Sequence, residues 1–175
     1  MIKIYVEGKS DKFFLDALCK EIKIDEFETI SVGSNNFSLS NLELVKSDIN
    51  DKRVEKIYIV FDADNDYQKT KTNLEQQLIN LQKIKIFLLP NNKDNGELED
   101  LLKKIAKHPC FIICFEEYIN CLKNKGNTNL NKKELNKNLI YSYNQACGNR
   151  IKNICLEHYN LDHEYIEPLI DFLKA

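Results

Sequence analysis

The segment "KIYIVFDADND" (residues 56–66) decides the fold class. After its first lysine, the run from 57 to 61 is wholly apolar and rich in β-branched and aromatic side chains, and it ends abruptly in acids. A short apolar run bounded by turn-forming residues predicts a strand that is buried on both faces. Such strands are typical of parallel sheets that carry helices on both sides. The segment therefore predicts an α/β protein.

The rest of the chain extends this pattern in both directions. Further strands are expected at residues 2–6, 28–32 and 83–90, and helices at residues 10–22, 38–49, 69–81 and 96–106. The alternating order predicts a mostly parallel four-stranded sheet with helices on both faces. We assign this α/β core to residues 1–107. We expect Ser10 to cap the first helix.

From His108 onward the patterns are helical only, so residues 108–175 are expected to form an all-helical extension packed on the core. Residues 124–131 read as a loop, and residues 132–159 as a long helix that Gly148 interrupts.

Composition and termini indicate a protein that acts inside the cell. The chain has 175 residues, of which 43% are hydrophobic and 30% charged. No apolar run approaches the roughly 20 residues of a membrane helix, and the N-terminus enters a strand pattern instead of a signal peptide. We therefore expect a cytoplasmic location and no membrane partner. The chain has no room for a topoisomerase gate domain, a helicase domain or a zinc domain, so topoisomerase and primase activities are not expected from it alone.

The six cysteines are expected to be reduced thiols. Cysteine and histidine lie close together in the sequence at residues 108–114 and 155–158, as they do in zinc sites. Neither range contains the CxxC pair that is common in structural zinc sites, so zinc is not expected. Cys110, Cys114 and Cys121 fall on one side of a predicted helix, and we interpret that side as buried.

The letters "GKS" at residues 8–10 imitate the end of a phosphate-binding loop. Such a loop needs a glycine five positions before Gly8, because its backbone amides must wrap the phosphates. Lys3 occupies that position, inside a predicted strand. No nucleotide cofactor is therefore expected, although Lys9 can still meet a phosphate as a single charge.

Acidic residues follow two of the predicted strands. Asp62, Asp64 and Asp66 come after the strand at 56–61, and Glu7 comes after the strand at 2–6. The carboxyl ends of parallel strands meet at one edge of a sheet, where ligands bind. Clustered carboxylates without nearby histidine or cysteine favour Mg²⁺ or Mn²⁺.

The segment "DADND" has two other interpretations. An EF-hand loop would require glycine where Tyr67 stands and glutamate where Asn73 stands, so the segment fails on two defining residues. Asp-rich segments also form plain turns, because their side chains bond the local backbone. That structural interpretation stays open for these residues alone.

Two segments of the chain, each containing some of these acidic residues, resemble the motifs of a known family. "VEGKSD" (6–11) and "IVFDADND" (59–66) are similar to the two motifs of the Toprim fold, in the same order and in the same α/β context, over residues 1–106. "LLPNNKDNGELEDLL" (88–102) and "LDHEYIEPLIDFL" (161–173) resemble the DUF3226 group of small stand-alone Toprim-like proteins. Toprim domains occur in topoisomerases, bacterial-type primases, RecR-type repair proteins and OLD-family nucleases, and the chain is also similar to the last of these.

The resemblance implies roles for individual residues. Glu7, Asp62 and Asp64 would be catalytic, with Glu7 as a general acid or base or as a metal ligand and the two aspartates holding Mg²⁺ or Mn²⁺. The further implied metal ligands are Asp11, Asp66, Glu99 and Asp100, the last two by analogy with OLD-family nucleases.

These observations lead to one leading function and two alternatives. The leading expectation is a Mg²⁺-dependent, nuclease-like enzyme acting on DNA or RNA. The alternatives are a non-catalytic Toprim-like module that binds nucleic acid or protein, and a catalytic subunit that needs a protein partner. The net charge is −2, but residues 103–152 carry ten basic and three acidic side chains, a net charge of +7. This segment is either a solvated helix face or a nucleic-acid contact, for which the candidates are Lys9, Lys132, Lys133 and Lys137.

Overall fold

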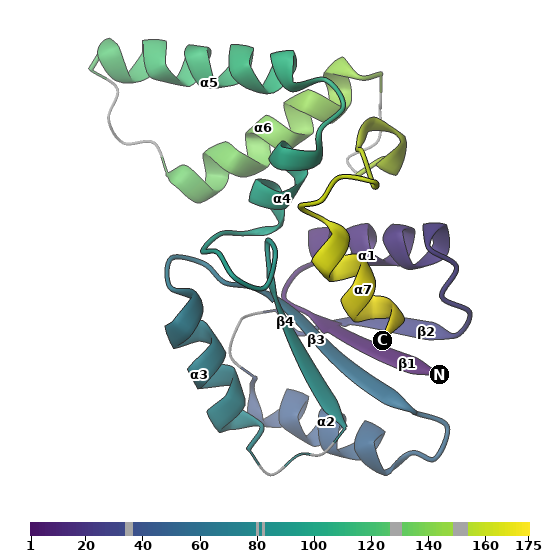
Figure 1. Cartoon of the computed structure of the whole chain (residues 1–175). Helices are drawn as coiled ribbons and strands as arrows, with labels where there is room; N and C mark the ends of the chain where they lie inside the picture. The colour runs from purple at the N-terminus through teal and green to yellow at the C-terminus, as the bar shows by residue number, and fades with distance from the viewer. Residues whose placement is uncertain (34–36, 80, 82, 127–130, 149–153) are drawn as a thin grey trace.

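The centre of the protein is a parallel β-sheet (Figure 1). The computed structural model describes residues 1–175 except 34–36, 80, 82, 127–130 and 149–153. Within these described residues the sheet has four strands in the order β2-β1-β3-β4, and every neighbouring pair is parallel. The strands are β1 (Ile2–Val6), β2 (Phe27–Ser31), β3 (Lys56–Asp62) and β4 (Ile84–Leu89). The expected fold class is confirmed, and the architecture is consistent with a Toprim-like fold.

Helices cover both faces of the sheet, as the apolar strands require. Side chains along β1 alternate between the two faces: Ile4 and Val6 belong to one buried cluster, and Tyr5 belongs to the other. The first cluster includes residues of α1 (Lys9–Glu21) and α7 (Glu167–Lys174). The second includes residues of α2 (Leu39–Asn50) and α3 (Tyr67–Gln77).

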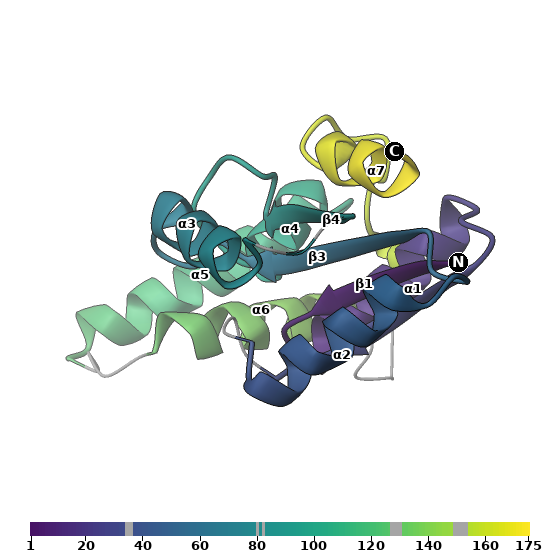
Figure 2. The ribbon, with the colours of Figure 1, turned by 90° about the horizontal axis from the view of Figure 1, so that it is seen from below.

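Three helices lie beyond the carboxyl ends of the strands, in the upper part of Figure 1. They are α4 (Leu98–Ile105), α5 (Pro109–Asn124) and α6 (Lys132–Ala146). Figure 2 shows α5 and α6 projecting past the sheet. This placement matters for function, because it brings α6 over the edge where the acidic residues emerge.

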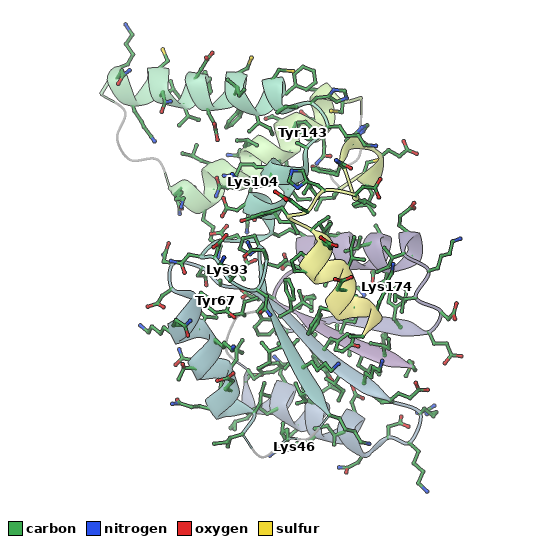
Figure 3. All side chains as sticks on the ribbon, in the orientation of Figure 1. Lys46, Tyr67, Lys93, Lys104, Tyr143 and Lys174 are labelled. Atoms are coloured by element: carbon green, nitrogen blue, oxygen red, sulfur yellow. The ribbon has the colours of Figure 1, made fainter. Side chains whose placement is uncertain are left out.

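Aromatic side chains join the later helices to the sheet and to one another. The Phe172 ring of α7 lies 4.7 Å from the Tyr58 ring and 5.2 Å from the Phe87 ring, measured between centroids. Tyr143 of α6, labelled in Figure 3, donates its hydroxyl proton to the His158 carbonyl at 2.7 Å, next to the short helix η1 (Leu156–His158). A single buried cluster thus includes residues from β1 through to α7.

Two local expectations are wrong. Gly8, not Ser10, is the N-cap of α1, and Asp11 at the third helical position accepts a hydrogen bond from the Gly8 N–H at 2.7 Å. Cys110, Cys114 and Cys121 are exposed, not buried, because α5 projects from the body and buries few of its residues.

The helix expected over 132–159 ends at Ala146, with Gly148 at a positive φ of 90° two residues later. Residues 127–130 of the expected loop at 124–131, and residues 149–153, lie outside the described part of the chain. None of the described helices has both the length and the apolar character that a membrane span requires.

Candidate functional site

A cavity of about 210 Å³ lies at the carboxyl ends of β1 and β3. Four acidic side chains line it, and three lysines line it as well. Its charged residues are Glu7, Asp11, Asp62, Glu99, Lys9, Lys133 and Lys137. Residues far apart in the sequence therefore meet here, because parallel strands end at one edge and α6 crosses that edge.

The turn from β1 into α1 places Glu7 and Asp11. Glu7 directly follows β1, and its Oε1 accepts a hydrogen bond from the backbone N–H of Asp62 at 3.0 Å. Asp11 is held by the Gly8 N–H, and a Cβ added at Gly8 would lie only 3.1 Å from Asp11 Oδ2. The φ of Gly8 is −123°, which any residue can adopt. It is therefore the close approach of Asp11, not the backbone conformation, that favours glycine at position 8.

Asp62 links β3 to the start of α4. Its Oδ1 accepts a hydrogen bond from the backbone N–H of Leu98 at 3.0 Å, and Leu98 is the first residue of α4. The positive end of a helix favours a carboxylate at this position. Only 7% of the Asp62 surface is exposed, so the carboxyl group is held in a largely dry position.

Burial makes these acids hard to ionise. It raises the pKa of Glu7 to about 7. The hydrogen bond from the Asp62 N–H stabilises the charged form and lowers this pKa, whereas the charges of Asp64 and Asp11 raise it further. Burial also raises the pKa of Glu99 to about 7. The pKa of Asp62 lies well above its ordinary value because of burial and the charges of Asp11, Glu7 and Glu99.

Lys133 supplies a positive charge between two further carboxylates. Its Nζ lies 3.0 Å from Asp64 Oδ1 and 3.8 Å from Glu97 Oε1. Burial lowers the pKa of Lys133, but the hydrogen bond and charge of Asp64 and the charge of Glu97 outweigh it, so the net direction is upward. Glu97 Oε2 is buried with no hydrogen-bond partner among the described residues.

The other predicted residues lie outside this cavity. Asp66 is the N-cap of α3 and accepts from the Lys69 N–H at 3.0 Å. Asp100 accepts from the Glu97 N–H at 3.1 Å and pairs with Lys103 at 2.8 Å. Lys132 lines a separate hollow between α5 and α6. Nowhere in the described ranges do three His, Cys, Asp or Glu side chains already converge as a metal site.

Sequence reasoning missed Glu97. It precedes α4 and reaches Lys133, whereas the prediction for this segment chose Glu99 and Asp100. The spacing of "GELED" places Glu97 and Glu99 two apart, as Asp62 and Asp64 are, and that repeated spacing is the signal that would have included it.

Fold and cavity together define an α/β protein with a lysine-flanked acidic site at the carboxyl edge of a parallel sheet. The family model described as protein of unknown function (DUF3226) matches residues 1–175, so the chain belongs to that family. This confirms the DUF3226 part of the resemblance. Comparisons with curated proteins and with solved structures found no match.

Proposed function

We propose that this protein is a Toprim-type, divalent-metal-dependent enzyme that cleaves phosphodiester bonds in DNA or RNA. The observation that carries the proposal is the shared cavity, in which the buried carboxylates of Asp11, Asp62 and Glu99 and the partly buried Glu7 face lysines from α1 and α6. Buried acids crowded in this way repel one another unless a cation or a proton compensates them.

The donor atoms suit Mg²⁺ or Mn²⁺. All are hard carboxylate oxygens, and the unpartnered Oε2 of Glu97 is a further oxygen that a cation would satisfy. Mg²⁺ usually binds through one or two carboxylates, with water and substrate phosphates as its other ligands. A ready-made cluster of three protein ligands is therefore not required. Asp62 and Asp64 would hold the ion, with Glu97 beside them.

The chain's own residues would share the work of cleavage. A bound cation supplies charge neutralisation at the phosphate and an acidified water. Glu7 has a pKa near 7 and its Oε1 accepts from the Asp62 N–H, so its Oε2 would exchange a proton with water or with the leaving oxygen. Lys9 and Lys137 line the same cavity and would pair with phosphate oxygens.

A cleavage assay tests this proposal directly. Labelled single-stranded and double-stranded DNA and RNA would be incubated with Mg²⁺, Mn²⁺ or EDTA. We expect cleavage with either metal, none with EDTA, and a loss of about 100-fold or more in Glu7→Gln, because that change removes the proton-transfer group. Glu43→Gln, an exposed change on α2, is the matched control. Cleavage that persists in EDTA or in Glu7→Gln would show that the site is wrongly assigned.

Removing the Lys133 ammonium is expected to strengthen Mn²⁺ binding. Lys133 lies where a cation would contact Asp64 and Glu97, so Lys133→Gln frees both carboxylates for the metal. Titration calorimetry or Mn²⁺ electron paramagnetic resonance should show an affinity several-fold higher than that of the unmodified protein. Lys132→Gln, one residue away but outside the cavity, should leave the affinity unchanged. Weaker binding in Lys133→Gln would mean that the two cations do not compete.

A second candidate function is a nucleic-acid-binding module without turnover. The Lys133–Asp64 ion pair favours it, because an internal ammonium compensates the acids without any metal. Under this alternative the same assay would show binding that depends on Lys9 and Lys137, with no cleavage in any metal and no heat of Mn²⁺ binding.

A further inference from the structure

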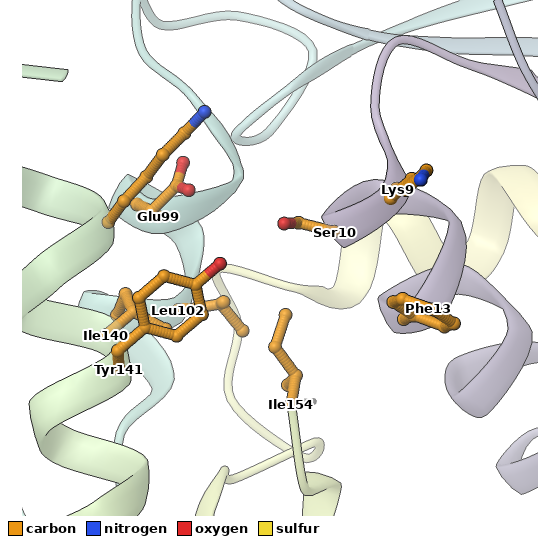
Figure 4. A pocket seen from close by; sticks show the side chains of 9 residues that line it. Lys9, Ser10, Phe13, Glu99, Leu102, Ile140, Tyr141 and Ile154 are labelled. Atoms are coloured by element: carbon orange, nitrogen blue, oxygen red, sulfur yellow. The ribbon is translucent and has the colours of Figure 1, made fainter. Parts of the chain in front are cut away.

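A second cavity, of about 150 Å³, adjoins the acidic one (Figure 4). The two share Lys9, Ser10, Glu99 and Lys137. The remaining lining of the second cavity is apolar or aromatic: Phe13, Leu102, Ile140, Tyr141 and Ile154. A charged chamber therefore continues directly into an apolar one.

The two walls of the second cavity come from different helices. In Figure 4, Ser10 and Phe13 project from α1 on one side, and Ile140 and Tyr141 from α6 on the other. Leu102 and Ile140 are buried and form an apolar floor. Phe13 and Tyr141 are 46% and 41% exposed, so their rings are accessible from solvent.

These features together match one kind of ligand. A single exposed aromatic residue is ordinary on a protein surface, but here two of them line one hollow that also includes Lys9 and Lys137 of the acidic cavity. Single-stranded nucleic acids are held by this combination, with bases stacked on aromatic rings and phosphates on cations. The volume lies below the roughly 300–1,000 Å³ of pockets that enclose drug-sized ligands, which suits one ring system.

We propose that this cavity binds an unpaired nucleobase of the nucleic-acid substrate, stacked against Tyr141 or Phe13, while the adjoining phosphate lies over Lys9 and Lys137. The inference rests on the proposed function for the identity of the substrate, and it deepens that function by specifying the strand state. A base within a duplex has both faces covered by its neighbours, so the enzyme should prefer single strands, overhangs or frayed ends over blunt duplexes.

Binding to an oligonucleotide with a single fluorescent 2-aminopurine base tests the inference without turnover. The measurement is made in EDTA, with DNA and RNA versions of the strand. Stacking on an aromatic ring should quench the fluorescence, and Tyr141→Ala should weaken binding about 5- to 100-fold and reduce the quench. Tyr141→Phe should keep both, because it retains the ring. Tyr118→Ala on α5 is the control, since Tyr118 is also exposed but lies outside the cavity.

Three results would overturn the inference. One is unchanged binding and quench when both Phe13 and Tyr141 are replaced by alanine. The second is equal affinity for a strand with an abasic site in place of the reporter base. The third is a free 2-aminopurine nucleotide that binds as tightly as the strand, which would reassign the cavity to mononucleotides.

The two proposals fail in different ways. If no substrate is cleaved but base-dependent binding still requires Tyr141, the base site stands and the enzymatic function falls. If cleavage requires Glu7 and metal but ignores Tyr141 and strand state, the function stands and the base site falls.

Discussion

Replacing Asp62 with asparagine should reduce metal-dependent cleavage about 100-fold or more and leave the protein at least as stable at pH 8. Asparagine has the same shape, and its Oδ1 can still accept the hydrogen bond from the Leu98 N–H. The backbone N–H that donates to Glu7 is untouched. What is lost is the negative charge that would bind the cation.

The stability gain follows from the same burial. Burial raises the pKa of Asp62 and the charges of Asp11, Glu7 and Glu99 add to the rise, so the ionised form of Asp62 is costly in the folded protein. A neutral amide removes that repulsion, so thermal unfolding of Asp62→Asn in EDTA should occur at an equal or higher temperature. Activity and stability are thus expected to move in opposite directions, as they do where a site holds like charges for function.

Asp66→Asn is the matched control for this substitution. Asp66 belongs to the same acidic segment, but it caps α3 through the Lys69 N–H, and asparagine caps helices about as well as aspartate. Both activity and stability should be close to those of the unmodified protein. If Asp62→Asn cleaves as fast as the unmodified protein, Asp62 is not part of the active site. If the variant is much less stable, the charge of Asp62 is compensated within the fold.

The second large effect is a fall in stability between about pH 4.5 and pH 7. Burial raises the pKa of both Glu7 and Glu99 from 4.5 to about 7, so the folded protein holds protons that the unfolded chain releases in this range. Stability is therefore highest below pH 4.5 as far as these groups are concerned, falls as pH rises, and levels off above pH 7. Each group contributes about 3 kcal/mol over the range, because one pKa unit corresponds to about 1.4 kcal/mol.

Urea unfolding at a series of pH values measures this effect. Glu7→Gln and Glu99→Gln should each flatten the dependence, since the amide does not titrate. Saturating Mg²⁺ should restore stability above pH 7 by binding the ionised acids of the folded protein only. A pH profile that neither variant alters would show that these carboxyl groups are solvated in the native state.

Much of the fold followed from the sequence because its strands are locally obvious. The run ending in Phe61 is apolar on both faces, and Pro90 follows the fourth strand, so the sheet was predictable. The meeting of Glu7 and Asp62 followed from a general property of parallel strands.

The remaining parts of the site depend on how helices pack, which periodicity does not specify. Lys133 reaches Asp64 because α6 lies beyond the carboxyl ends of the strands. Asp66 and Asp100 accept hydrogen bonds from nearby backbone N–H groups at helix starts. These local hydrogen bonds compete with metal binding, and acidic composition alone does not reveal them. The prediction that the cysteines of α5 are buried is wrong for a related reason, because this helix projects from the body and leaves them exposed.

The position of α6 late in the chain sets the order in which the site is built during synthesis. Glu7 and Asp62 leave the ribosome well before Lys133 and Lys137, and N-terminal regions begin to fold first. Lys9 is already present at this stage, but the Lys133 ammonium that pairs with Asp64 has not yet been made. Under the proposed function, a divalent cation would meet this edge before Lys133 does, and the Lys133 ion pair would form later in competition with it.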